Sequence, residues 1–123
     1  MEFKIDTKPT YLVITPVTNH LDANLADALR QKCTESEGDV HNYIIDLHNC
    51  LDADKSSFNA LIELHEICYE NGRSLVFTGL QDDVMKIIKE EEADLALNIA
   101  PKMAEAVDIV SMEALERDLF NEE

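Results

Sequence analysis

The sequence has 123 residues, about the length of one domain, and 46% of them are hydrophobic, which suffices for a single core and excludes a disordered tail. Its 26 acidic and 10 basic residues give a formal net charge of −16, so nucleic acids and anionic membrane surfaces would repel it. No apolar run reaches the roughly 20 residues of a membrane helix, and the amino terminus lacks a signal-peptide pattern, so we expect a cytoplasmic protein without membrane insertion.

The first elements along the chain are predicted to be two strands and a helix. Residues 3–6 alternate apolar and polar side chains, and residues 11–14 form a second β-rich run, which together predict a hairpin that turns at Pro9. Asp22 is then placed to cap a helix that ends near residues 35–38. The apolar residues of this helix recur at helical spacing: Leu21, Leu25, Ala28, Leu29 and Cys33.

The middle of the chain predicts two buried strands around a second helix. Residues 43–47 show almost no alternation, which indicates a central strand covered on both faces. A helix is expected over residues 54–71 and stops at residues 71–72, where glycine suits the left-handed position after a helix. Residues 75–78 then form a short buried strand before a turn at Gly79. The inner face of the helix would hold Phe58, Leu61, Ile62, Leu64 and Cys68.

A third helix is expected over residues 82–91, because acidic side chains at its start complement the helix dipole. The acidic residues 90–92 would form its solvated end. Residues 95–99 predict a weak strand or an extended segment. The inner face of the third helix would hold Val84, Ile87 and Ile88.

A final helix is expected from Lys102 onward, with a frayed end near residues 120–123. The order of elements contains strand–helix–strand crossovers, so we predict one α/β domain over residues 1–123 with helices on a mixed sheet. The apolar residues that carry the final helix are Met103, Val107, Val110, Ala114 and Leu115.

The histidines and cysteines predict neither a metal site nor catalysis. Cys33, Cys50 and Cys68 contain no Cys-x-x-Cys pair and fit buried, reduced thiols. His65 lies three residues before Cys68, and His48 lies two before Cys50, but these spacings match no zinc signature. The sequence also holds no Gly-rich phosphate loop and no nucleophile elbow. We therefore expect no metal, no cofactor and no enzymatic activity.

Three local patterns carry a resemblance to a known family. They are residues 21–29 at the start of the first helix, residues 43–47 followed by residues 54–57, and residues 71–77 followed by Gly79. Together they resemble the STAS domain, the fold of bacterial anti-sigma factor antagonists, over nearly the whole chain. The resemblance implies an α/β fold with a mixed β-sheet of about four to five strands and about four α-helices.

The resemblance also places a phosphorylation site at the start of the second helix. In that family the central strand leads to an Asp-Ser-Ser-Gly turn, and its second serine is phosphorylated. The aspartate corresponds to Asp54 and the phosphoacceptor to Ser56. Lys55 stands where the family has its first serine and Ser57 where it has glycine, so Ser57 is the alternative acceptor. The residues expected to bind a partner are Asp54, Lys55, Ser56, Ser57, Phe58 and Asn59.

The function implied by the resemblance is regulatory protein binding in bacterial transcription control. The partner would be an anti-sigma factor that is also the serine kinase, and a serine phosphatase would be a further partner. Binding of the unphosphorylated domain would free a sigma factor. A phosphate adds about −1.5 to −2 units of charge to the surface that the partner touches, so the modified domain would dissociate.

Three alternatives stay open on the sequence. Asp54 could simply cap the helix, with the following serines satisfying first-turn N–H groups. The chain could be an unphosphorylated scaffold or accessory subunit of a signalling or transport complex, which Lys55 and Ser57 favour. It could also be a receiver-like phosphorelay domain, since Asp46 and Thr78 end neighbouring strands, although the first strands offer no acidic pair for Mg²⁺.

Overall fold

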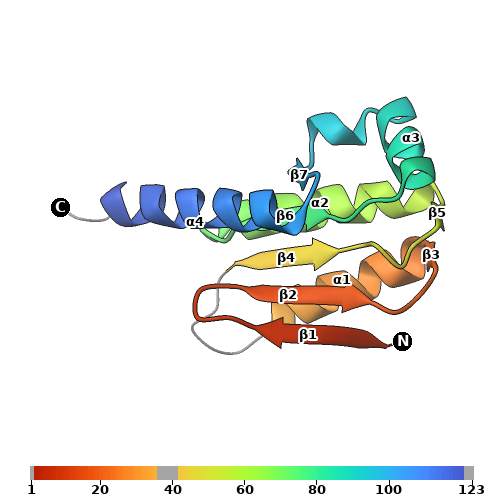
Figure 1. The fold of residues 1–123 in the computed structure, drawn as a ribbon. Coiled ribbons are helices and arrows are strands. Elements are labelled where there is room, and N and C mark those ends of the chain that lie inside the picture. Colours follow the sequence, from red (N-terminus) through yellow and green to blue (C-terminus); the bar gives the residue numbers. More distant parts are fainter. Residues whose placement is uncertain (1, 36–41, 121–123) are drawn as a thin grey trace.

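The computed structural model describes residues 2–35 and 42–120, which form a five-stranded sheet, a two-stranded sheet and helices (Figure 1). The strands of the larger sheet are β1 (Phe3–Thr7), β2 (Leu12–Pro16), β4 (Tyr43–Asp46), β6 (Leu75–Thr78) and β7 (Ile99–Ala100). The smaller sheet pairs β3 (His20–Leu21) with β5 (Asp52–Ala53). The helices are α1 (Ala23–Glu35), α2 (Ser56–Glu70), α3 (Asp82–Glu90) and α4 (Met103–Phe120), with a 3₁₀ turn at Ala93–Leu95.

The larger sheet has the strand order β1-β2-β4-β6-β7 and is mixed. β1 pairs antiparallel with β2, and the remaining neighbours pair in parallel. The predicted amino-terminal hairpin and the central position of β4 are therefore confirmed. Because parallel strands end at the same edge, the loops that follow β2, β4 and β6 gather at one end of the sheet.

Successive side chains of each strand enter two different cores. Ile45 and Phe77 belong to the larger core, which α1, α2 and α3 share, whereas Ile44 and Val76 face α4. α1 and α2 thus cover one face of the sheet, and α4 lies across β4, β6 and β7 on the other (Figure 1). This layering explains why β4 is apolar on both of its faces.

Local signals in the sequence set the ends of two helices. The Oδ1 atom of Asp22 accepts a hydrogen bond from the backbone N–H of Leu25 at 2.8 Å, which is the predicted cap of α1. Gly72 follows the end of α2 with a φ of +69°, a left-handed conformation that glycine adopts without strain. Both predictions are confirmed.

Three expected boundaries or faces are wrong. The second helix begins at Ser56 rather than at residue 54. Leu95 ends a 3₁₀ turn and is 80% exposed, and of residues 95–99, which were expected to form a weak strand or an extended segment, only Ile99 lies in a strand, at the start of β7. Leu115 faces solvent instead of the core. The expected frayed terminus at residues 121–123, and an end of the first helix beyond residue 35, lie outside the described residues.

Candidate functional site

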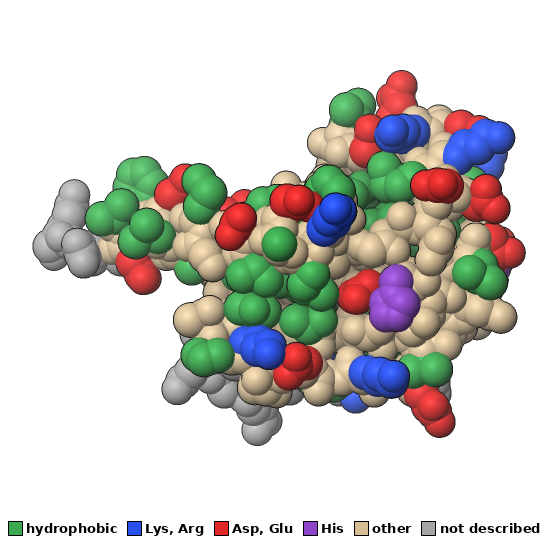
Figure 2. All heavy atoms as spheres, in the orientation of Figure 1, with side chains coloured by type: hydrophobic (Ala, Val, Ile, Leu, Met, Phe, Trp, Pro, Cys, Tyr) green, Lys and Arg blue, Asp and Glu red, His purple; other side chains and the backbone are tan. Residues whose placement is uncertain are grey.

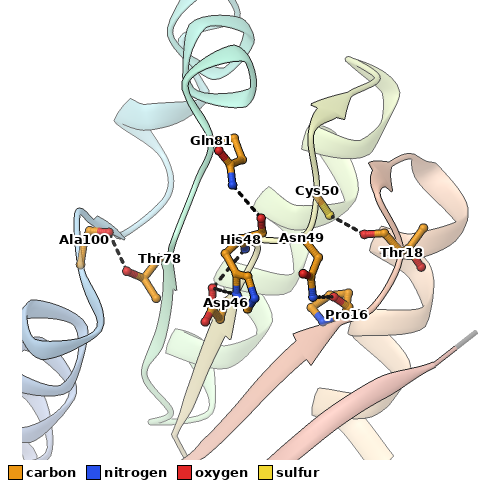
Figure 3. A network of polar contacts seen from close by, with 9 residues as sticks. All are labelled: Pro16, Thr18, Asp46, His48, Asn49, Cys50, Thr78, Gln81 and Ala100. Carbon is orange, nitrogen blue, oxygen red and sulfur yellow. Dashed lines mark hydrogen bonds and ion pairs between the residues drawn. The ribbon is translucent and has the colours of Figure 1, made fainter.

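The loop between β4 and α2 is anchored to its surroundings before it reaches the predicted site. Asn49 donates its side-chain amide to the carbonyl of Pro16 at 3.0 Å, and Gln81 donates to the carbonyl of His48 at 2.7 Å (Figure 3). Nearer to α2, the backbone N–H of Asp54 bonds to the carbonyl of Leu21 at 2.8 Å within the small β3–β5 sheet. The start of α2 is therefore fixed relative to the main sheet.

Asp46 and Thr78, the two strand ends that suggested a receiver-like domain, make hydrogen bonds to neighbouring parts of the fold. Asp46 accepts hydrogen bonds from the backbone N–H of His48 at 3.1 Å and contacts the Nδ1 atom of the same residue at 2.9 Å (Figure 3). Thr78 donates its hydroxyl to the carbonyl of Ala100 at 2.9 Å, so it ties β6 to β7. β2 ends at Pro16 and offers no carboxylate beside Asp46. Asp46 and Thr78 thus each make a contact that fixes the local backbone.

The two candidate acceptor serines lie in opposite environments. Ser56 is exposed on the first turn of α2, whereas Ser57 is fully buried and donates its hydroxyl to the carbonyl of Asp54 at 2.7 Å. Ser56 is therefore accessible to solvent in this conformation, and Ser57 is not.

The other expected partner-binding residues divide in the same way. Asp54, Lys55 and Asn59 are exposed next to Ser56, but Phe58 is 3% exposed and packs in the larger core. Asp54 does not cap α2, because Lys55 occupies the cap position and makes no side-chain capping bond. The surface that a partner could touch is thus formed by four of the six expected residues.

A shallow hollow of about 350 Å³ lies beside Ser56, between α2 and the end of α3. Lys55 and Glu91 span it with an ion pair of 3.3 Å between Nζ and Oε1. Both side chains are substantially exposed, and exposed pairs contribute about 0–1 kcal/mol, so this pair can open readily. The residues that line the hollow are Lys55, Ser56, Phe58, Asn59, Ile62, Glu91 and Ala93.

A second charged cluster flanks the site on the side of the small sheet. His20 contacts Asp52 through Nδ1 and Asp54 through Nε2, the latter at 3.3 Å. The pKa of His20 is raised above its ordinary value, mainly by its hydrogen bond with Asp52 and then by the one with Asp54. Protonated His20 therefore joins two carboxylates directly before α2.

The His20 cluster predicts a pH dependence of stability. Because its pKa is higher in the folded chain than in the unfolded one, its contribution is fully present below about pH 6.5 and is lost as the pH rises through the raised value. The urea midpoint of the wild type should therefore exceed that of His20→Gln at acidic pH, and the two should converge at alkaline pH. NMR titration of the ring protons provides a second measurement: His20 should titrate at higher pH than His65, whose pKa burial lowers. The opposite order would contradict the cluster.

The three cysteines are buried, and His65 is half-buried. Cys33, Cys50 and Cys68 are free, buried thiols, as expected. Burial raises the pKa of the Cys50 and Cys68 thiols to about 11 and also raises that of Cys33. His65 stacks on Tyr69 with 4.4 Å between ring centroids. Over residues 2–35 and 42–120, no group of three or more His, Cys, Asp or Glu residues could hold a metal ion.

A family model of the STAS domain matches residues 2–106. The chain belongs to the STAS domain family. The mixed sheet with four helices in the described part of the chain agrees with the fold that the resemblance implied. A search of curated proteins finds no match for this STAS domain. Within the residues that the structure describes, no helix is long and apolar enough to cross a bilayer.

Solved structures share this fold at low sequence identity. RsbS of Moorella thermoacetica, in a variant with glutamate in place of a serine, is 21% identical, with a TM-score of 0.69 and coverage of 93% of this chain and 98% of that one. The anti-sigma factor antagonist SpoIIAA in its unphosphorylated form is 17% identical, with a TM-score of 0.69 and coverage of 89% and 96%. The murine anion transporter Slc26a9 is 17% identical, with a TM-score of 0.66 and coverage of 83% of this chain and 18% of the transporter.

Proposed function

We propose that this STAS domain binds an anti-sigma factor through the exposed surface at the start of α2, and that phosphorylation of Ser56 by that partner ends the complex. The observation that carries the proposal is the contrast between the two serines: Ser56 is exposed, while the hydroxyl of Ser57 is buried and already bonded. Asp54, Lys55 and Asn59 would complete the contact surface.

A phosphate on Ser56 would change the surface rather than the fold. The first turn of a helix has unpaired N–H groups and a partial positive charge, so it tolerates an anion. The modification nevertheless adds about −1.5 to −2 units of charge beside Glu91 and Asp54, in a region that is already acidic. A partner that buries this surface would have to bury the phosphate as well, so its affinity would fall.

The charge of the domain indicates the kind of partner surface that fits. A chain with a net charge of −16 meets a basic surface faster than a neutral one, and salt weakens this attraction. The relatives support a switch at a serine, because SpoIIAA is described in an unphosphorylated form and RsbS with a glutamate in place of a serine. When the domain binds the anti-sigma factor, the sigma factor would be freed and become active. A serine phosphatase would remove the phosphate from Ser56 and so restore the form of the domain that binds.

The proposal predicts how single substitutions change recovery of the partner. In a pull-down from native lysate, wild type and Ser56→Ala should retain one kinase-like partner, and Ser56→Asp should lose most of it. A buried, unmatched charge that costs about 3 kcal/mol lowers affinity about a hundredfold. Ser111→Asp, at an exposed serine on α4, is the matched control for added charge and should bind like wild type. Equal recovery with Ser56→Ala and Ser56→Asp would contradict the switch.

A second candidate function is an unphosphorylated scaffold or an accessory part of a transport complex. It is favoured by the likeness to part of Slc26a9 and by Lys55, which departs from the family pattern and pairs with Glu91 in the structure. Mass spectrometry of the protein from its own cells separates the two functions. Phosphate on Ser56 supports the switch, and its absence across growth conditions supports the scaffold.

A further inference from the structure

The last helix exposes a row of large apolar side chains. Met112, Leu115 and Leu119 are 63%, 60% and 61% exposed, and Phe120 beside them is 82% exposed. Positions 112, 115 and 119 follow the i, i+3, i+7 spacing that places side chains on one face of a helix. We name Met112, Leu115, Leu119 and Phe120 the α4 stripe.

The α4 stripe does not contribute to the core of this chain. Ala106 and Val110 are the buried residues of α4 that pack on the sheet, and helical geometry places them on the side opposite Leu115. The carboxyl-terminal half of α4 extends past the strands (Figure 1), and hydrophobic and acidic side chains both lie along it on the face that Figure 2 shows. The helix is therefore apolar on two opposite sides, and among the described residues only the side with Ala106 and Val110 is covered.

The charges around the α4 stripe indicate what would cover it. Asp108, Glu116 and Asp118 are exposed on the same helix as the stripe. Arg117 is turned toward the body, where it donates to Ser74 Oγ at 3.0 Å and to Asn42 Oδ1 at 2.7 Å. The rim that a partner would meet is thus acidic.

We propose that the α4 stripe binds an amphipathic helix of another protein, with apolar side chains on one face and Lys or Arg on its flanks. A second copy of this chain is disfavoured, because two copies would bring their acidic rims together and each carries a net charge of −16. An anionic membrane is disfavoured for the same reason. A basic helix matches both the apolar row and the charge of the rim.

A hollow lies beside Phe120, where the end of the stripe meets the body of the domain. It has a volume of about 290 Å³ and lies between the end of α2 and α4. Its lining carries both signs of charge, because Glu113 and Glu116 lie there together with Arg117. The choice of a basic partner therefore rests on the exposed acidic rim of α4 and not on this hollow.

The stripe is separate from the surface at Ser56. α2 has 15 residues and so is about 22 Å long, with Ser56 at its start and the hollow beside its end. A partner on α4 would leave Ser56 accessible, and phosphorylation of Ser56 would leave this binding unchanged. The proposal therefore stands or falls independently of the anti-sigma factor proposal.

The test measures how a fluorescently labelled synthetic helix, with leucine on one face and lysine on the others, binds to the full chain. Binding is followed by the fluorescence anisotropy of the label. Leu115→Gln with Leu119→Gln removes the apolar row without changing charge, and should weaken binding at least about tenfold. The matched control replaces two exposed leucines elsewhere, Leu51→Gln with Leu95→Gln, and should bind like wild type. Salt should weaken the wild-type complex, and the same helix with glutamate in place of lysine should not bind.

Two further measurements decide between occupants. Equal affinity of both double variants for the lysine helix would overturn the proposal, since binding would then be general attraction to an acidic protein. Sedimentation of the wild type as a dimer that Leu115→Gln with Leu119→Gln abolishes would assign the stripe to a second copy. Co-sedimentation with phosphatidylglycerol vesicles, lost in the same variant, would assign it to a membrane. Thermal unfolding by circular dichroism checks that both variants are folded.

Discussion

Replacing Phe58 by alanine should lower the free energy of unfolding by about 3–5 kcal/mol, the usual cost of removing a buried phenyl ring. The side chain is 3% exposed and packs in the larger core. A domain of this size is stabilised by about 5–15 kcal/mol, so the variant would lose a large share of its stability. Urea unfolding followed by circular dichroism measures the change.

Asn59→Ala is the matched control for Phe58→Ala. Asn59 is the next residue of α2, is exposed, and should change stability by less than about 0.5 kcal/mol. The pair also separates stability from binding, because both residues were expected to contact a partner. An unchanged urea midpoint for Phe58→Ala, together with weaker partner binding, would show that the ring is a contact residue rather than part of the core.

Gly79→Ala should destabilise the domain by about 2–4 kcal/mol. Gly79 has a φ of +72°, which strains any residue with a Cβ atom, and an added Cβ would collide with Oδ1 of Asp46. That carboxylate is held by His48, so it cannot move away without loss of the turn after β4. Differential scanning calorimetry should show a large fall in the melting temperature.

Gly72→Ala provides the comparison for the steric part of this effect. Gly72 has a similar φ of +69°, but an added Cβ would meet only the Cδ atom of Arg117, at an ordinary 3.9 Å. This variant should therefore cost about 1 kcal/mol, from backbone strain alone. Equal destabilisation by both substitutions would show that contact with Asp46 contributes nothing.

The parts of the fold that the sequence predicted are those set by neighbouring residues. Alternation of apolar and polar side chains over a few positions suffices to predict the hairpin. The absence of this alternation suffices to predict that β4 is buried on both faces. Asp22 and Gly72 mark helix ends because the group that each satisfies lies within three or four residues. The family resemblance then supplied the way in which these elements are joined.

The environment of the candidate site could not be predicted in the same way. Whether Ser56 or Ser57 faces solvent depends on the residue at which α2 begins, and helix starts are uncertain by about two to four residues from sequence. Glu91 pairs with Lys55 only because the fold brings the end of α3 next to the start of α2, and the sequence indicated no more than a solvated acidic end. Nothing in the acidic residues 90–92 themselves indicates an ion pair with Lys55, which is far from them in the sequence.

The outer face of α4 shows a different limit. Periodicity assigns a helix one buried side, and Leu115 was placed there together with Val110. α4 carries apolar residues on two opposite sides, so spacing alone cannot say which of them the sheet covers. Only the packing of Ala106 and Val110 on the strands resolves this ambiguity.

The anchored loop before α2 affects the thermodynamics of any complex formed there. Ordering a flexible segment costs about 1–2 kcal/mol per residue in backbone entropy, and a ligand that must order its target pays this cost during association. Here the hydrogen bonds of Asn49, Gln81 and Asp54 already order the loop when the domain folds, so the entropy cost does not fall on association. The surface around Ser56 is thus preorganised, and a docking protein can engage it with little induced fit.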